Sequence, residues 1–292
     1  MLATQENQVI LDDPQLASAM RVGTKAVHKA AENSKFTRRF LKGDITIDEY
    51  SQYILSLYFV YKKMEELLEK YQEDPAIEMI YFPDELNREQ ALLKDLEYFY
   101  GKEDIETIIQ PESMTPAVKQ YVQAMENACK INPALMVSHS YARYLGDLSG
   151  GQILAKRLKK HILHLEKTDG TWDSNSGLSF YYFNNIGNQN EFKNMYRQQL
   201  DEAPVTEHLK NLIVEEAVRC FELNIALFDE IQNLSDNNQL TKRTHNENTH
   251  IKNDYPMTES SNLLPIPALA TVITGLTVIT IGYATYSKYK TN

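Results

Sequence analysis

The sequence is poor in cysteine and has no excess of positive charge. Its two cysteines, Cys129 and Cys220, lie too far apart for a metal-binding or redox motif. We expect both to be buried thiols of a protein in a reducing compartment. The formal net charge of -10 and the isoelectric point near 5.3 exclude a general affinity for nucleic acid, because phosphate binding needs a basic face.

A secretory signal is also lacking, since no basic region followed by an apolar run opens the chain. We expect residues 1–12 to form a flexible tail. The one long uncharged apolar run lies near the other end, at residues 263–286. A helix of that length crosses a hydrocarbon core about 30 Å thick. We therefore predict a transmembrane tail anchor there, preceded by a polar flexible tether at 235–262 and followed by a short lumenal tail at 287–292.

Alternating strand patterns are scarce, and the aromatic run at 180–183 is the single exception. Across residues 13–234 the apolar residues recur with the helical period. Helix starts are indicated by Asp13-Pro14, by the capping box Thr46 to Glu49, and by Thr115-Pro116 and Asn132-Pro133. The pattern predicts one all-α domain of about eight helices.

Glycine is scarce as well, yet three of the eleven glycines, Gly146, Gly150 and Gly151, fall close together in a segment with a helical pattern. Each costs about 1 kcal/mol relative to alanine in a helix interior. Their clustering predicts that something flat and bulky lies against bare backbone. Asp147 is the only acid among them.

Two histidines are candidate ligands for a metal-containing group. His28 lies on an amphipathic helix with Glu32 one turn later, and that carboxylate can orient the ring. His139 adjoins the glycine segment. The residues alone leave the choice between these two histidines open.

Three motifs resemble those of the heme oxygenases: Thr-Lys-x-Val-His at 24–28, Tyr-Phe-Pro at 81–83, and Tyr-x-Arg-Tyr-Leu-Gly-Asp-Leu-Ser-Gly-Gly-Gln at 141–152. The resemblance covers about residues 12 to 234, and the tether and anchor match the microsomal eukaryotic layout. It implies a single multi-helix domain that holds heme between a proximal and a distal helix. The implied reaction is oxidative cleavage at the α-meso carbon to biliverdin, CO and Fe2+, using O2 and electrons.

The resemblance also implies a role for each site residue. It makes His28 the proximal iron ligand with Glu32 behind it, and it leaves His139 off the iron. Gly146 and Gly150 would let the distal helix approach the heme closely. Asp147 would hold ordered water in a network with Arg143, Tyr61 and Asn224. The heme propionates and the pocket wall would be contacted by Arg21, Lys25, Tyr141, Lys193, Arg197, Phe221 and Phe228. Arg21 and Thr37 depart from the lysine and methionine expected in relatives.

The sequence carries no flavin or nicotinamide motif, so electrons must come from a partner. The resemblance implies NADPH-cytochrome P450 reductase, an endoplasmic reticulum location with the domain facing the cytosol, and biliverdin reductase downstream. The basic run Lys156, Arg157, Lys159 and Lys160 is a candidate docking face. Two alternatives are a non-catalytic heme sensor or carrier, which has no need of the Gly146-Asp147 pair, and a thiaminase-type bundle, whose active-site cysteine is missing.

Overall fold

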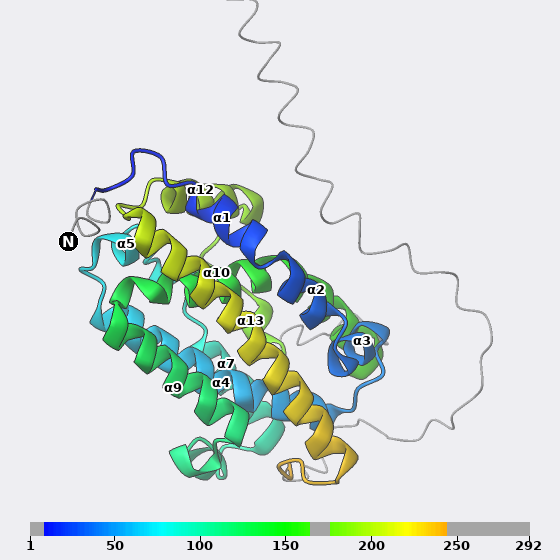
Figure 1. The fold of residues 1–292 in the computed structure, drawn as a ribbon. Helices are drawn as coiled ribbons and strands as arrows, with labels where there is room; N and C mark the ends of the chain where they lie inside the picture. The colour runs from blue at the N-terminus through cyan, green and yellow to red at the C-terminus, as the bar shows by residue number, and fades with distance from the viewer. Residues whose placement is uncertain (1–8, 164–175, 244–292) are drawn as a thin grey trace, which may run out of the picture. The chain divides into compact units, whose positions relative to one another are not determined.

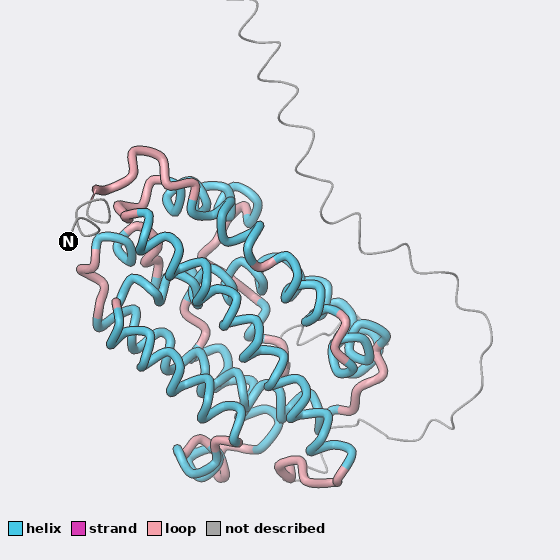
Figure 2. Tube along the Cα trace, viewed as in Figure 1, coloured by secondary structure: helices cyan, strands magenta, loops and turns pink. Residues whose placement is uncertain are grey.

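The computed structural model describes residues 9–163 and 176–243, all of which belong to one compact unit, Met1–His250. Within these ranges the chain is helical, and its only pairing of extended backbone is an isolated antiparallel bridge between Ile10 and Thr206 (Figure 2). The all-α prediction is confirmed.

The described residues form more helices than the eight or so expected, because several are short. The longer ones are α1 (Leu16–Gly23), α2 (Lys25–Glu32), α3 (Lys35–Lys42), α4 (Ile47–Lys70), α7 (Glu89–Tyr100), α9 (Pro116–Ile131), α10 (Met136–Gly146), α11 (Gln152–Arg157), α12 (Gln189–Asp201) and α13 (Glu207–Asp236). Single turns form α5 (Pro75–Glu78), α6 (Pro83–Leu86) and α8 (Ile105–Ile108). The aromatic run at 180–183 begins in a 3-10 turn, Ser179–Tyr181, within a loop region.

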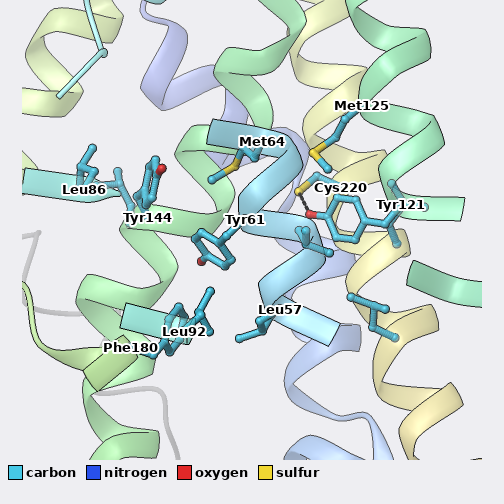
Figure 3. Close-up of a cluster of buried hydrophobic side chains, with 14 of the residues drawn as sticks. Leu57, Tyr61, Met64, Leu86, Leu92, Tyr121, Met125, Tyr144, Phe180 and Cys220 are labelled. Carbon is cyan, nitrogen blue, oxygen red and sulfur yellow. Dashed lines mark hydrogen bonds between the residues drawn. The ribbon is translucent and has the colours of Figure 1, made fainter. Parts of the chain in front are cut away.

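Helix α4 is the centre of the domain. Its predicted capping box is present, with the Thr46 hydroxyl accepting from the Glu49 amide and the Glu49 carboxylate accepting from the Thr46 amide. Most of its residues are buried, and α7, α9, α10 and α13 pack against it. Figure 1 shows α13 crossing the domain, with α4 and α9 on one side and α1, α2 and α3 in succession along the other. Figure 3 shows part of the resulting core, in which residues of α4 meet Tyr121, Met125, Tyr144, Phe180 and Cys220.

The amino-terminal helix differs from the prediction in two ways. The apolar period after Asp13-Pro14 predicts one continuous helix through Leu16, Met20, Thr24, Val27 and Ala31. In the structure this helix is broken at Thr24, whose hydroxyl donates back to the Met20 carbonyl at 2.7 Å. Such bonds compete with the helical ladder and bend helices. The predicted Asp13-Pro14 cap is wrong, because α1 begins at Leu16 and its Ala17 amide donates to the Asp201 carboxylate of α12 at 2.8 Å.

The other predicted helix starts are confirmed in position. Asn132 accepts a hydrogen bond from the Ala134 amide at 2.9 Å, as a cap does. Thr115 precedes α9 but does not cap it. Instead the Glu230 carboxylate accepts from the Ala117 amide at 3.0 Å, and from the Thr115 hydroxyl, so this cap comes from a distant helix.

Helix α13 ends at Asp236, just past the predicted domain end at residue 234, and the chain then turns back onto α4. The Thr241 amide donates to the Gln52 side chain at 2.9 Å, and Arg243 pairs with Asp48. The rest of the predicted tether, the anchor at 263–286 and both terminal tails lie outside the described residues. In the part of the chain that the structure describes, no helix has both the length and the apolar character needed to cross a membrane.

Candidate functional site

The glycine segment departs from regular α-helix where the motif lies. Between α10 and α11 the residues Asp147–Gly151 form a π-helical turn, a feature frequent at functional sites. A Cβ placed on Gly146 or Gly150 would meet nothing within 4 Å, whereas one on Gly23 would lie 2.5 Å from Val214 Cγ1. Packing within the protein therefore explains Gly23 but not Gly146 or Gly150, whose backbone faces open space.

A cavity of about 140 Å³ lies between α2, α3, α4, α11 and α13. Four of the predicted site residues line it: His28, Glu32, Phe221 and Phe228. The remaining wall is mostly apolar and consists of Ala31, Phe36, Thr37, Phe40, Tyr53 and Leu154. Leu154 follows Gly150 by four residues in sequence, whereas Gly146, Asp147 and Gly150 are not among the residues that line the cavity.

His28 is placed as a ligand would be. Its side chain is 53% exposed, and its Nδ1 lies 3.5 Å from Glu32 Oε1, a distance that needs a small closure to become a hydrogen bond. Its ring packs against Phe221 with a centroid separation of 5.3 Å. The Nε2 atom has no hydrogen-bond partner among the described residues, so it is available to a group in the cavity.

His139 is held elsewhere. Its side chain is completely buried, its Nε2 lies 2.9 Å from Glu216 Oε1, and its ring packs on Tyr121. Burial disfavours the protonated form, but the neighbouring Cys220 and Glu216 side chains raise the pKa of His139 to about 9. His139 does not line the cavity, and a protonated imidazole cannot ligate a metal.

Asp147 is buried below the glycine segment, where it meets two of the predicted partners. The Tyr61 hydroxyl donates to its Oδ2, and Arg143 Nη2 lies 3.7 Å from its Oδ1. Arg143 Nε also donates to the Tyr61 oxygen at 3.1 Å. Burial raises the pKa of Asp147 to about 6, although the Arg143 charge and the Tyr61 hydrogen bond act to lower it. The carboxyl can therefore exchange a proton near neutral pH.

The network continues to Asn224, as predicted, and then to two residues that sequence reasoning missed. Arg143 Nη1 donates to Asn224 Oδ1, and Asn224 Nδ2 donates to the Cys220 carbonyl at 2.8 Å and the Tyr121 hydroxyl at 3.3 Å. The Tyr121 hydroxyl oxygen and Cys220 Sγ are hydrogen-bonded at 2.9 Å (Figure 3). The helical period places Tyr121 on the buried face of α9, but its partners on α13 are not visible in the sequence.

A third missed residue, Tyr53, lies on α4 and forms part of the cavity wall. Burial raises the pKa of its hydroxyl, and the nearby Arg143 opposes that shift. It therefore connects the apolar cavity to the Asp147 network. The period of α4 predicts only that Tyr53 is buried.

The predicted cations gather on the other side of the glycine segment. Lys193 Nζ donates to the Leu148 carbonyl at 3.2 Å and to Ser149 Oγ at 3.4 Å, and Arg197 Nη1 donates to the Lys193 carbonyl at 3.2 Å. Burial lowers the pKa of Lys193, as does the Arg197 charge. Burial raises the pKa of Tyr141, while Arg197 and Arg21 oppose that shift, so these three residues share one neighbourhood.

These cations have no protein counter-ion in the described ranges: no ion pair joins a carboxylate to Arg21, Lys25, Lys193 or Arg197. Arg21 and Lys25 are exposed on α1 and α2, and Lys193 and Arg197 are half-buried on α12. Such a cluster fits the carboxylates of an anionic ligand. The structure thus places His28, Glu32, Phe221 and Phe228 on one cavity. It joins Asp147, Arg143, Tyr61 and Asn224 in one buried network, and it brings Arg21, Tyr141 and Arg197 into one neighbourhood.

A larger hollow, of about 580 Å³, lies between α9 and the end of α13. Its wall contains Asp229 and Glu230 but no histidine and no cation. It therefore offers neither an imidazole ligand nor a cation for an anionic ligand, and we do not assign the site there.

Known proteins match this chain over the same domain. The heme oxygenase family model matches residues 14–230. Human heme oxygenase 1 is 40% identical over 219 residues, which are 75% of this chain and 72% of the human protein. The structure of heme oxygenase-2 from Synechocystis sp. PCC 6803 with heme and NO has a TM-score of 0.68 and 35% identity, over 77% of this chain and 88% of that one. Heme oxygenase from Leptospira interrogans has a TM-score of 0.64 and 38% identity, over 74% of this chain and 99% of that one. The chain therefore belongs to the heme oxygenase family of enzymes, which oxidatively degrade heme.

Proposed function

We propose that this protein cleaves heme at the α-meso carbon to biliverdin, CO and Fe2+, using O2 and electrons from NADPH-cytochrome P450 reductase. The observation that carries the proposal is the open space above Gly146 and Gly150, with the buried Asp147 network directly beside it. A protein that only carried heme would gain nothing from holding an acid in its interior at that position.

The residues present fit heme. His28 Nε2 would bind the iron, and the aromatic and aliphatic cavity wall would contact the macrocycle. Arg21, Lys25, Lys193 and Arg197, together with the Tyr141 hydroxyl, would hold the propionates. Bound heme supplies both the iron at which O2 is reduced and the ring that is cut. The missing Cβ atoms at Gly146 and Gly150 leave room for a flat molecule against the backbone.

Asp147 would hold and exchange a proton beside the reacting ring. A carboxyl with a pKa of about 6 is populated in both forms near neutral pH, which suits a group that passes protons through ordered water. Tyr61 and Arg143 fix its orientation, and Asn224 fixes Arg143. Their task is therefore to position the carboxyl, while Asp147 is the group that exchanges the proton.

The placement of charge would select the meso carbon that is cut. The cations lie beside α12 and the apolar wall lies at α3 and α13. Propionates are excluded from the apolar side because an unpaired charge buried there is costly. Arg21, Lys193 and Arg197 on one side and the apolar wall on the other would therefore hold heme in a single orientation.

Our proposals for the partners and the location rest on the resemblance to the family and on the sequence. Electrons would come from the reductase docked on the run Lys156 to Lys160, and biliverdin reductase would act on the product. The apolar segment 263–286 would anchor the protein in the endoplasmic reticulum membrane, with the catalytic domain in the cytosol.

The test is turnover by the purified protein supplied with hemin, the reductase and NADPH. We expect the Soret absorption of heme to disappear while biliverdin absorption grows and CO is released. Asp147→Ala should bind heme and release little biliverdin. Stable heme binding by the unaltered protein, with no bilin and no CO, would support the carrier alternative and contradict the proposal.

A further inference from the structure

The Tyr181 hydroxyl is buried without a partner. The residue is 2% exposed, and in the part of the chain that the structure describes its hydroxyl oxygen makes no hydrogen bond. Burying a hydroxyl that lacks a partner destabilises a fold, so such groups are rare in native proteins. A phenol hydroxyl can both donate and accept a hydrogen bond. An unpaired one in the interior therefore indicates a small polar molecule bound to it.

The backbone around Tyr181 is fixed against the glycine segment. The Asp95 carboxylate of α7 accepts hydrogen bonds from the first two amides of the turn Ser179–Tyr181, at 2.7 and 2.8 Å. Gln152 Nε2 donates to the Tyr181 carbonyl at 3.0 Å and to the Asp147 carbonyl at 3.3 Å. One side-chain amide thus joins the turn to the glycine segment, and it keeps Tyr181 beside Asp147.

The side chains of Tyr181 and Asp147 meet at Gly151. A Cβ on Gly151 would lie 3.5 Å from Asp147 Cβ and 3.5 Å from Cδ1 and Cε1 of the Tyr181 ring. Burial raises the pKa of Tyr181 well above its ordinary value, and the nearby Tyr53 and Asp147 side chains act in the same direction. The Tyr181 hydroxyl is therefore close to the acid of the buried network and to a residue of the cavity wall.

The surroundings of this hydroxyl fit a water molecule. Tyr50 of α4 also lies nearby, but its hydroxyl donates to the Gly177 carbonyl at 3.1 Å, so its oxygen is left as an acceptor. Asp147 and Arg143 supply one negative and one positive charge. Asp147 would repel an anion and Arg143 would repel a cation, whereas water can both donate to the oxygens and accept from the hydroxyls. Buried water typically makes about three hydrogen bonds, and these groups offer that many.

The acid and the cavity are separate in the fold. Asp147 does not line the cavity that contains His28, whereas Tyr53 does. A proton held by Asp147 therefore needs a carrier to reach that cavity. Tyr181 adjoins both Asp147 and Tyr53, so a water on its hydroxyl lies where the carrier is needed.

We infer that the Tyr181 hydroxyl holds a water molecule between Asp147 and Tyr53, and that this water carries protons between the acid and the heme cavity. The inference rests on the proposed function, because it concerns how the proton of Asp147 reaches bound heme. Each group on the route accepts one proton and releases another. The proton lost by Asp147 thus appears at the cavity, and both hydroxyls return to their neutral form. Tyr181 is a positioning residue, since it acts through the water.

The first test uses the heme-free protein and Tyr181→Phe, which removes the hydroxyl and leaves the ring. A crystal structure of the unaltered protein should show a water within hydrogen-bonding distance of the Tyr181 oxygen. The thermal unfolding midpoint of Tyr181→Phe should fall by about 2 to 4 °C, because the bound water loses a partner. The absence of a water at this oxygen, or a midpoint that rises, would overturn the inference, since phenylalanine stabilises a position where a hydroxyl is unpaired.

The second test is turnover with hemin, the reductase and NADPH. Tyr181→Phe should keep its heme affinity and form biliverdin on the order of 10- to 100-fold more slowly, at or below the low end of what positioned proton transfer contributes. Its solvent deuterium isotope effect should exceed that of the unaltered protein, because proton delivery becomes rate-limiting. Tyr53→Phe should slow the reaction equally, and the double variant should be no slower, since both changes interrupt one route. An unchanged rate and isotope effect in Tyr181→Phe would overturn the proton route.

The matched control is Tyr100→Phe. Tyr100 is buried as deeply, at 1% exposed, but its hydroxyl donates to Ser51 Oγ at 3.3 Å. This variant should lose stability and keep its rate and isotope effect. Equal slowing in Tyr100→Phe would assign the effect to the fold and overturn the route. Heme binding without turnover by the unaltered protein would remove the proposed function and with it the route, whereas the crystal structure and the unfolding midpoint judge the water site at Tyr181 independently.

Discussion

The Tyr61 hydroxyl donates a hydrogen bond to the Asp147 carboxylate, and both side chains are buried below the glycine segment. Arg143 lies against both, and its guanidinium is in turn held by Asn224. Burial affects the pKa of Asp147 more than the opposing effects of Arg143 and Tyr61 do, and it raises this pKa to about 6. The fold therefore keeps an acid where ionisation is unfavourable, which is typical of a site that uses the proton.

Asp147→Asn should stabilise the heme-free protein at neutral pH while abolishing turnover. The pKa of Asp147 is about 6 in the folded protein, above its ordinary value of 3.8. The protonated carboxyl therefore contributes its full stabilisation below about pH 4, and this contribution is lost as the pH rises through 6. At pH 7.5 the ionised form costs on the order of 3 kcal/mol, which the amide avoids. Denaturant unfolding at pH 4 and 7.5 measures the difference.

The free energy of unfolding of Asp147→Asn should exceed that of the unaltered protein at pH 7.5, and the two should be equal at pH 4. Asp229→Asn, at an exposed position of α13, is the control and should change neither value by more than about 0.5 kcal/mol. A loss of stability in Asp147→Asn at pH 7.5 would show that the ionised carboxylate stabilises the fold, which contradicts a raised pKa of Asp147.

Gly146→Ala and Gly150→Ala should separate heme binding from stability. The added methyl groups meet nothing within 4 Å, so the heme-free protein should keep its stability or gain up to about 1 kcal/mol from helix propensity. Heme affinity and turnover should fall, because the methyl groups occupy the space where the macrocycle approaches. Thermal unfolding and heme titration of each variant measure the two effects.

Gly43→Ala is the comparison for the glycine variants. Its φ of 75° and the His161 side chain 2.5 Å from its Cβ make any side chain strained. We expect it to lose about 1 to 3 kcal/mol of stability. Unchanged heme affinity in both distal glycine variants would show that the open space is not the heme site.

Arg197→Glu should change which meso carbon is cut. It places an anion beside Lys193 and Tyr141, where a propionate would bind, and repulsion should rotate the macrocycle toward other cations. Chromatography of the biliverdin isomers measures the outcome, and Arg197→Lys should preserve the unaltered pattern. A product that remains purely the α isomer in Arg197→Glu would remove this residue from heme orientation.

The sequence predicted the helical content and much of the site because those signals are local. The helical period and the Thr46 capping box depend on residues a few positions apart, and the motif at 141–152 contains Arg143, Gly146, Asp147 and Gly150. In the structure Arg143 and Asp147 form a buried network with Tyr61 and Asn224, and a Cβ on Gly146 or Gly150 would face open space. Their chemical roles stay predictions, as do the tether and the anchor.

The parts that could not be predicted depend on contacts distant in sequence. At the start of α1 the Ala17 amide donates to the Asp201 carboxylate, and at the start of α9 the Ala117 amide donates to the Glu230 carboxylate. Likewise Tyr121 reaches the Asn224 network only because α9 and α13 pack side by side. No local pattern indicates which distant carboxylate or hydroxyl completes a cap or a network.

The most direct test of the account is which histidine binds the iron, measured by the low-frequency iron-histidine vibration of the ferrous heme complex. The account predicts that the vibration persists in His139→Ala, since His139 is sealed against Glu216, and disappears in His28→Ala. Turnover should vanish with it, and added imidazole should partly restore turnover by filling the vacated position. A vibration that survives in His28→Ala and is lost in His139→Ala would contradict the placement of heme between His28 and the glycine segment.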